Sequence, residues 1–294
     1  MRLLTRSGLG LAILAVACSR GSDAPAVREE TAQPPQRIIS LIPSATETIV
    51  ALGAADRFVA RTEFDVDPSL AHLPSVGEGL TPSLEQLTVL EPDLVVAWPD
   101  NVSRSVIGRL EEFGVRVYSP QVQSLADLRD ATLELGRILG LEGAADSLVN
   151  AIDSGLGMVR DAVAGRERTS VFYVVWYDPP TTSGSGTFID ELIELAGGRN
   201  VFADAPGLWP QVSMEEVVRR QPDIILVSQT ESIPIDLERF EEAVGWRELR
   251  AVREGRVVQV DANLYNRPGA RVAEAARELA KLLHPGAFTA ETAK

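Results

Sequence analysis

Apolar and polar residues follow one another along the chain in blocks that predict strands followed by helices. The segment RIISLIP, residues 37–43, is an apolar run of strand length, and a helical pattern follows it from Ser44 to about Gly53. A second such run, TSVFYVVWY at residues 169–177, precedes the helical segment FIDELIELAGG. Strands and helices that alternate at this length are typical of mostly parallel sheets covered by helices. We therefore expect an α/β fold.

An internal repeat predicts that this fold consists of two similar lobes. SLEQLTVLEPDLVVAW, residues 83–98, is echoed in register by SMEEVVRRQPDIILVS, residues 213–228. In each copy a serine precedes a short amphipathic helix, and a Pro-Asp pair ends that helix before an apolar strand. Ser83 and Ser213 are therefore expected to be N-caps. We expect two Rossmann-like lobes with mainly parallel sheets, at residues 37–140 and 169–288.

A helical tract joins the two lobes. Residues 124–140 and 144–165 carry apolar side chains at a spacing of three to four, with a serine at the start of the first segment and a glycine at the end of each. The second segment is long enough to lie along both lobes, so residues 141–168 are expected to form a backbone helix that restricts hinge motion. Ligands of such sheets bind at the carboxyl ends of the strands, which directs attention to the loops after Pro43, Trp98 and Tyr177.

The first residues resemble an export signal. Arg2 and Arg6 precede an apolar run at residues 9–17 that is too short to span a membrane, and Cys18 follows small residues. Cys18 is the only cysteine, so no intramolecular disulfide can form, and it occupies the place of the lipidated residue of a lipoprotein. We expect a lipoprotein signal peptide at residues 1–18 and a flexible tether at 19–36, with the protein anchored in the periplasm or at the cell surface. Ordinary cleavage at a small-residue site is the alternative.

Composition and charge exclude several classes of function. The formal charge of −14 disfavours nucleic acid as a partner. Only two histidines are present, His72 and His284, which we expect at the surface, so direct metal binding is disfavoured. The glycines of SGSG at residues 183–186 do not indicate a phosphate-binding loop, because no Gly-Lys-Ser or Gly-Lys-Thr follows them. A catalytic triad is not indicated either, because neither histidine is suitably placed. We expect neither an enzyme nor a resident cofactor.

Taken together, the segments SLIPSATETIVALG, PPTTSG, GGRNVF, WPQVS and NRPGAR, with the repeated helices, resemble the helical-backbone (class III) periplasmic binding proteins of ABC importers. Within this class the chain looks most like the cobalamin-binding component of a vitamin-uptake transporter. The resemblance implies a protein that clamps a corrinoid between two lobes and delivers it to permease subunits. A ferric-siderophore or haem receptor of the same fold is the alternative.

The resemblance also implies a ligand site. Trp98 and Trp209 match aromatic contact positions of the family, and Phe64 matches another. The chain departs from the family at Thr181, which is kept as a candidate ligand residue although better-known members have an aromatic residue there. It also departs at Gly77, where they have a tryptophan.

Further candidates come from neighbouring loops. Tyr177 and Tyr265 could compensate for the missing aromatic rings, and Asp261 and Arg267 could hydrogen-bond polar appendages of a ligand. The competing interpretation places the two tryptophans in a core or at a lobe interface, and the two charged residues in a surface ion pair.

A carboxylate on each lobe is a candidate for docking to the transporter. The resemblance implies that one acidic residue per lobe binds a basic pocket of the membrane subunits, and Glu85 and Glu215 stand at matching positions of the two copies of the repeat. A pair of carboxylates that only stabilise helix N-termini is the plainer interpretation, and both can hold together.

Overall fold

Each half of the chain builds a parallel sheet from short apolar strands. The computed structural model describes residues 33–80, 83–99, 101–230, 237–238 and 242–288. The first sheet has the order β1 (Ile38–Ser40), β2 (Leu94–Val96), β3 (Arg116–Tyr118). The second has the order β5 (Gly198–Asn200), β4 (Thr169–Val174), β6 (Ile224–Gln229), β7 (Val257–Asp261). Every strand pair in both sheets is parallel, as the sequence predicts.

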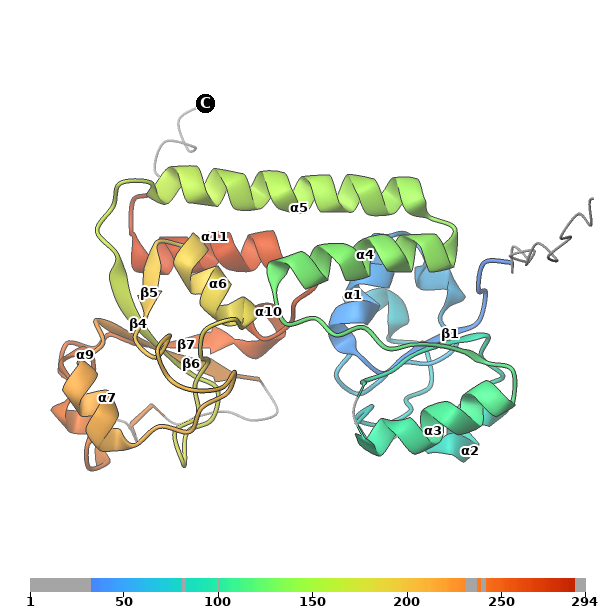
Figure 1. The fold of residues 1–294 in the computed structure, drawn as a ribbon, viewed down its shortest axis with the longest axis horizontal. Coiled ribbons are helices and arrows are strands. Elements are labelled where there is room, and N and C mark those ends of the chain that lie inside the picture. Colours follow the sequence, from blue (N-terminus) through green and yellow to red (C-terminus); the bar gives the residue numbers. More distant parts are fainter. Residues whose placement is uncertain (1–32, 81–82, 100, 231–236, 239–241, 289–294) are drawn as a thin grey trace, which may run out of the picture. The chain divides into compact units, whose positions relative to one another are not determined.

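Helices cover both sheets (Figure 1). In the N-terminal lobe these are α1 (Pro43–Ala51), α2 (Leu84–Val89), α3 (Asn101–Glu112) and α4 (Leu125–Leu139). In the C-terminal lobe they are α6 (Phe188–Leu195), α7 (Met214–Arg220), α9 (Arg250–Arg253), α10 (Ala262–Tyr265) and α11 (Val272–Leu283). The predicted two-lobe α/β fold is confirmed.

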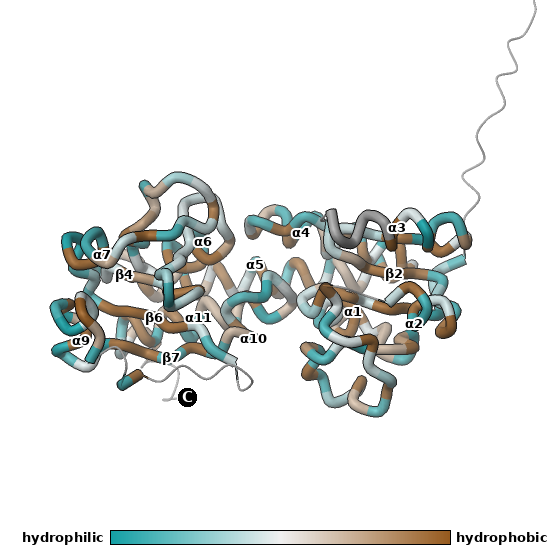
Figure 2. The backbone as a smooth tube through the Cα atoms, turned by 90° about the horizontal axis from the view of Figure 1, so that it is seen from below, coloured by the Kyte–Doolittle hydropathy of each residue, from teal (hydrophilic) through white to brown (hydrophobic). Residues whose placement is uncertain are grey.

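Each sheet is apolar on both faces, which is why its strands are nearly continuous hydrophobic runs. In β1, Ile38 and Ile39 belong to cores on opposite faces, because successive side chains of a strand point to opposite sides. In β6, Leu226 and Val227 are divided in the same way. The hydrophobic stretches of the backbone accordingly gather around β2 in one lobe and around β4 and β6 in the other (Figure 2).

The helix α5 (Glu142–Val163) is part of both lobes. Its 22 residues span about 33 Å at 1.5 Å per residue. Ala145, near its start, packs in the core of the N-terminal lobe, whereas Leu156 and Val159 pack in the core of the C-terminal lobe. Figure 1 shows α5 running along both lobes. Because a separate core holds each end, the helix is a stiff connection between the lobes.

Small residues allow α5 to pack closely on its neighbours. A Cβ atom built on Gly136 of α4 would lie 2.4 Å from the Cβ of Ala145, which is closer than two carbon atoms can approach. A Cβ on Gly155 of α5 would lie 2.8 Å from the Cβ of Ala273 in α11. The backbone-to-backbone contact on both sides of α5 therefore depends on glycine.

The two copies of the sequence repeat begin in the same way. The Oγ of Ser83 accepts a hydrogen bond from the backbone N of Gln86 at 3.4 Å, and the Oγ of Ser213 accepts one from the backbone N of Glu216 at 3.1 Å. Both serines satisfy an amide that the first helical turn leaves unpaired. The predicted N-caps of α2 and α7 are confirmed.

The two copies also end in the same way. Glu91 and Gln221 are the described non-glycine residues with positive φ, at 44° and 43°, and they occupy the same position in the two copies. Two residues later, Asp93 accepts from the backbone N of Arg37 at 2.9 Å, and Asp223 accepts from the backbone N of Ser170 at 2.9 Å. The aspartate of each Pro-Asp pair therefore links the segment after the helix to the neighbouring strand, β1 or β4, through a hydrogen bond to its backbone.

Several features predicted near the termini lie outside the described residues or differ from expectation. The signal peptide, Cys18 and most of the tether fall in residues 1–32, which the structure does not describe. The described helices include none with the length and apolarity needed to cross a membrane. The prediction that His284 lies at the surface is wrong: the end of α11 packs on Gly197, the residue is buried, and its Nε2 lies 3.1 Å from the Gly197 carbonyl oxygen.

Candidate ligand-binding cleft

Loops at the carboxyl ends of strands from both sheets line one cleft of about 510 Å³. From the N-terminal lobe, Pro43 follows β1 and Trp98 follows β2. From the C-terminal lobe, Thr230 follows β6 and Asn263 follows β7. This is the place where parallel sheets bind ligands. The cleft therefore lies between the lobes, at the position that the strand order predicts.

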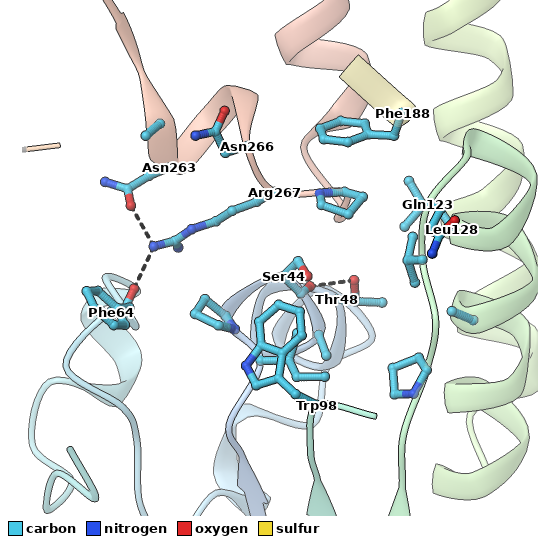
Figure 3. A pocket seen from close by; sticks show the side chains of 18 of the residues that line it. Ser44, Thr48, Phe64, Trp98, Gln123, Leu128, Phe188, Asn263, Asn266 and Arg267 are labelled. Atoms are coloured by element: carbon cyan, nitrogen blue, oxygen red, sulfur yellow. Dashed lines mark hydrogen bonds between the residues drawn. The ribbon is translucent and has the colours of Figure 1, made fainter. Parts of the chain in front are cut away.

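Most of the lining is apolar and aromatic. Trp98 is half-buried and rests on the core of the N-terminal lobe. Phe188, the first residue of α6, lines the cleft from the other lobe, where the Thr187 side chain caps the helix by accepting from the Asp190 backbone N at 3.1 Å. Figure 3 shows Trp98 and Phe188 on opposite sides of the open space. Trp209, 49 % exposed, adds an indole from the C-terminal lobe.

Three polar side chains, those of Asn263, Asn266 and Arg267, form a polar wall on one side of the cleft. Two hydrogen bonds hold the Asn266 amide in place. Its Oδ1 accepts from the Tyr173 hydroxyl at 2.6 Å, and its Nδ2 donates to the Ser228 Oγ at 2.7 Å. Complete burial raises the pKa of Tyr173 far above its usual value, so its hydroxyl remains a donor across the physiological range. The orientation of the Asn266 amide is thus fixed before a ligand arrives.

Arg267, which follows α10, joins this wall to the opposite lobe. Its Nη1 donates to the Oε1 of Glu47 in α1 at 2.8 Å, and its Nη2 donates to the carbonyl oxygen of Phe64 at 2.8 Å. The side chains of Arg267 and Glu47 are only 11 % and 14 % exposed. Burial raises the pKa of Glu47 above its ordinary value, and the hydrogen bond from Arg267 opposes this shift without cancelling it.

Four of the predicted ligand residues come together in this cleft. Phe64, Trp98, Trp209 and Arg267 all line it, although they come from distant parts of the sequence. Both tryptophans therefore face a shared opening.

The other four predicted residues lie elsewhere. Tyr177 stacks on Trp246 with ring centroids 6.0 Å apart, and Tyr265 is buried in the core of the C-terminal lobe. The Thr181 Oγ1 donates to the carbonyl oxygen of Pro179 at 3.2 Å. Asp261 caps α10 by accepting from the Asn263 backbone N at 2.9 Å. These four side chains have local structural partners and are absent from the lining of the cleft.

The sequence interpretation did not single out Glu47, Phe188, Asn263 or Asn266. A signal for Phe188 was present, because it begins the helix that follows the loop after Tyr177. Asn263 and Asn266 belong to the same NLYNRPGAR segment as Arg267. Glu47 gave no signal in the sequence, since its partner Arg267 lies near the other end of the chain.

The two predicted docking carboxylates are exposed at equivalent places. Glu85 lies in the first turn of α2, and Glu215 lies in the first turn of α7. Figure 1 shows α2 and α7 on different lobes, both on the side of the protein away from α5. In the part of the chain that the structure describes, no three His, Cys, Asp or Glu side chains cluster as a metal site would require.

Comparisons with known proteins agree with this architecture. The periplasmic binding protein family matches residues 38–264. The ABC transporter substrate-binding lipoprotein YvrC of Bacillus subtilis, itself uncharacterised, is 32 % identical over 262 residues, which cover 86 % of this chain and 82 % of the relative. The vitamin B12-binding protein of Vibrio cholerae is 30 % identical over 251 residues, covering 85 % of this chain and 90 % of the relative.

Solved structures are similar throughout the two lobes. The crystal structure of the periplasmic vitamin B12-binding protein of Vibrio cholerae has a TM-score of 0.72 and 29 % identity, covering 88 % of this chain and all of that chain. The periplasmic haem-binding protein BhuT in complex with two haems has a TM-score of 0.76 and 25 % identity, covering 85 % and 98 %. This chain belongs to the periplasmic binding protein family, whose members are extracytoplasmic substrate-binding components of transporters rather than enzymes.

Proposed function

We propose that this protein binds cobalamin or a related corrinoid in its interlobe cleft and delivers it to the permease of an ABC importer. The observation that carries the proposal is the composition of the cleft. Indoles from both lobes, Trp98 and Trp209, face one opening, and the arginine that lines this opening already has a carboxylate partner.

A corrinoid suits this arrangement physically. Its large macrocycle can be held by apolar and stacking contacts, each aromatic contact adding about 1 kcal/mol beyond the burial of its area. The uncharged amide arms of cobalamin can exchange hydrogen bonds with amides such as Asn263 without needing an ionic partner. The name of the Vibrio cholerae relative supports the same ligand class.

Haem is the second candidate, because one similar solved structure is a complex with haem and because Arg267 lies at the lining. A propionate would pair with a guanidinium in a bidentate manner. In this cleft, however, a propionate would have to compete with Glu47 for Arg267. The described lining contains one further charged side chain, Glu78, which would repel it.

Titration of the purified chain from Ser19 onward tests the proposal, since this chain retains the compact unit that begins at Pro34. Cobalamin, cobinamide, haem and a ferric siderophore are compared by calorimetry and by their absorbance. We expect one cobalamin to bind per protein, more tightly than haem or the siderophore. Tighter binding of haem or of the iron chelate would overturn the corrinoid assignment.

We propose further that Cys18 carries a lipid anchor, as its place after the apolar segment predicts. The name of the Bacillus subtilis relative, a lipoprotein, supports this proposal. Cys18→Ala should abolish incorporation of a labelled fatty acid and release the protein from the membrane fraction. Unchanged labelling would show that the lipid is attached elsewhere.

Glu85 and Glu215 are proposed to dock on the permease. Both are exposed, both occupy the same position of the repeat, and one lies on each lobe. Charges placed in this way would accelerate encounter with basic pockets and set the orientation of docking.

A further inference from the structure

A single arginine spans the cleft and is bonded on both sides before any ligand is present. From its position after α10, Arg267 reaches Glu47 and the Phe64 carbonyl of the N-terminal lobe, each at 2.8 Å. On its own lobe, its Nη2 donates to the Asn263 Oδ1 at 2.5 Å. Figure 3 shows the guanidinium between Phe64 and Asn263. Three hydrogen bonds therefore fix the position of this side chain.

The bond to Glu47 determines the charge that a ligand meets. Among the described residues that line the cleft, Arg267 is the only cation. An arginine without a partner in an apolar cleft is a strong receptor for carboxylate or phosphate groups. Because Glu47 already forms an ion pair with it, Arg267 presents little net charge to the cleft.

Glu47 is held in this position by packing as well as by charge. The loop after Arg267 lies against the start of α1, so that a Cβ on Gly269 would be 3.1 Å from the Ser44 carbonyl oxygen and 3.4 Å from the Glu47 Oε2. The other charged groups that act on the Glu47 carboxyl are Arg271 and Asp65. The Glu47 carboxylate is therefore confined between the start of α1 and this loop, which favours its bond to Arg267.

We infer that Glu47 determines specificity: by neutralising Arg267, it makes the cleft select ligands with uncharged polar arms over ligands with negatively charged arms. Glu47 acts through Arg267 and is a positioning residue, since it does not itself line the cleft. The inference rests on the proposed function and names the chemical feature of the ligand that the cleft accepts.

Two forms of one ligand test this role. Cobalamin and cobalamin monocarboxylic acid, in which one propionamide arm is hydrolysed to propionate, differ by a single negative charge. We expect the wild-type protein to prefer the amide form. Glu47→Gln keeps the shape and a hydrogen-bond acceptor for Arg267 but removes the charge, so it should lower the preference for the amide form by about tenfold. Arg267→Gln leaves Glu47 without its partner and should raise that preference instead.

The control is Glu63→Gln, which removes the same charge from the N-terminal lobe, beside Phe64, without freeing Arg267. It should change the preference by no more than about twofold, because Glu63 is exposed, lies outside the lining of the cleft, and has its charge screened by solvent. Either Glu47→Gln or Arg267→Gln decides the question alone if the other variant does not fold. An unchanged preference in the variant that folds, or an equal change in Glu63→Gln, would overturn the inference.

Haem, with two propionates, separates this inference from the proposed function. If the wild-type protein binds haem and no corrinoid, the corrinoid assignment falls, and haem then serves as the anionic probe. Glu47→Gln should still bind haem about tenfold more tightly than the wild-type protein does, and Glu63→Gln should not. Equal affinity of the wild-type protein and Glu47→Gln for haem would overturn the role of Glu47 in that case as well.

Discussion

At the scale of single residues, the cleft depends on aromatic side chains that the fold leaves uncovered. Trp209 is 49 % exposed on a loop of the C-terminal lobe, and Trp98 is half-buried above the core of the opposite lobe. An exposed indole makes few contacts within its own lobe, and at the lining of a cleft it is suited to ligand contact. Trp209 should therefore contribute to binding more than to stability.

The matched pair Trp209→Ala and Trp176→Ala tests this expectation. Trp176 is 55 % exposed on the same lobe, but it lies outside the cleft, and its Nε1 donates to the Asp178 carbonyl oxygen at 3.0 Å. Trp209→Ala should weaken ligand binding by about 1.5–3 kcal/mol, roughly tenfold to hundredfold. Trp176→Ala should leave the affinity within about twofold. Calorimetric titration measures both, and an equal loss in the two variants would show that the effect is not local to the cleft.

The raised pKa of Glu47 gives the protein a defined pH dependence. The folded state binds the Glu47 proton more tightly than the unfolded state does, because burial penalises the carboxylate. Binding of this proton therefore stabilises the folded state. The stabilisation is complete at a pH below the ordinary carboxyl pKa of the unfolded chain, and it is lost as the pH rises through the raised pKa of the folded protein. The free energy of unfolding of the wild-type protein, minus that of Glu47→Gln, should therefore fall as the pH rises through this window.

Urea unfolding at a series of pH values measures this difference, with Glu274→Gln as the control of opposite sign. The hydrogen bond from Arg271 lowers the pKa of Glu274, so stabilisation from that carboxylate is lost as the pH falls through its lowered pKa. The corresponding difference for Glu274→Gln should rise with pH. A rising difference for Glu47→Gln would mean that the ion pair with Arg267 outweighs burial.

Half of the eight ligand residues predicted from the sequence line the cleft, and the other half do not, for a physical reason. The rule that ligands bind at strand ends locates a loop but not the direction of each side chain within it. Around α10, the Asp261 side chain caps the helix through the Asn263 backbone N, and Tyr265 turns into the core. The side chains of Asn263 and Arg267 face the cleft. These directions are set by one turn of helix and by packing, which periodicity cannot resolve over so few residues.

At the scale of elements, the repeat was the most informative feature of the sequence. Its two copies predicted two N-caps and two similar lobes, and the structure adds the matching positive φ angles at Glu91 and Gln221. Local patterns of this kind are readable because capping and strand burial act within a few residues. The close approach of α4 and α5 was not readable, because the contact of Gly136 with Ala145 depends on how the two helices pack.

Two glycine-to-alanine substitutions should have opposite effects on stability. Gly136→Ala places a Cβ 2.4 Å from that of Ala145, so the helices must separate, at a cost of about 1–3 kcal/mol. Gly157→Ala lies inside α5, where an added Cβ meets nothing within 4 Å. It should stabilise the protein by roughly 0.5–1 kcal/mol, because alanine favours the helix. Chemical denaturation measures both, and destabilisation by Gly157→Ala would contradict the open space beside it.

At the scale of the whole molecule, α5 determines what the protein can do when a ligand binds. One end of the helix is buried in each core, so bending between the lobes would disturb packing in at least one of them. The Arg267–Glu47 pair joins the lobes at a second place. Large closure around a ligand is therefore disfavoured, and a partner that recognises both lobes meets its two contact points at a nearly constant separation.

This constant separation allows the docking proposal to be tested by charge reversal. Glu85→Lys with Glu215→Lys should abolish uptake of labelled cobalamin by cells that carry the variant in place of the wild-type protein, because both contacts with basic pockets become repulsive. Ligand affinity of the purified variant should be unchanged, since neither residue lines the cleft. The control is Asp146→Lys with Asp161→Lys, which makes the same change in charge at exposed positions of α5, on the opposite side from α2 and α7 (Figure 1). Uptake that falls equally in both double variants would attribute the effect to net charge, and lost affinity in the first would rule out a role confined to docking.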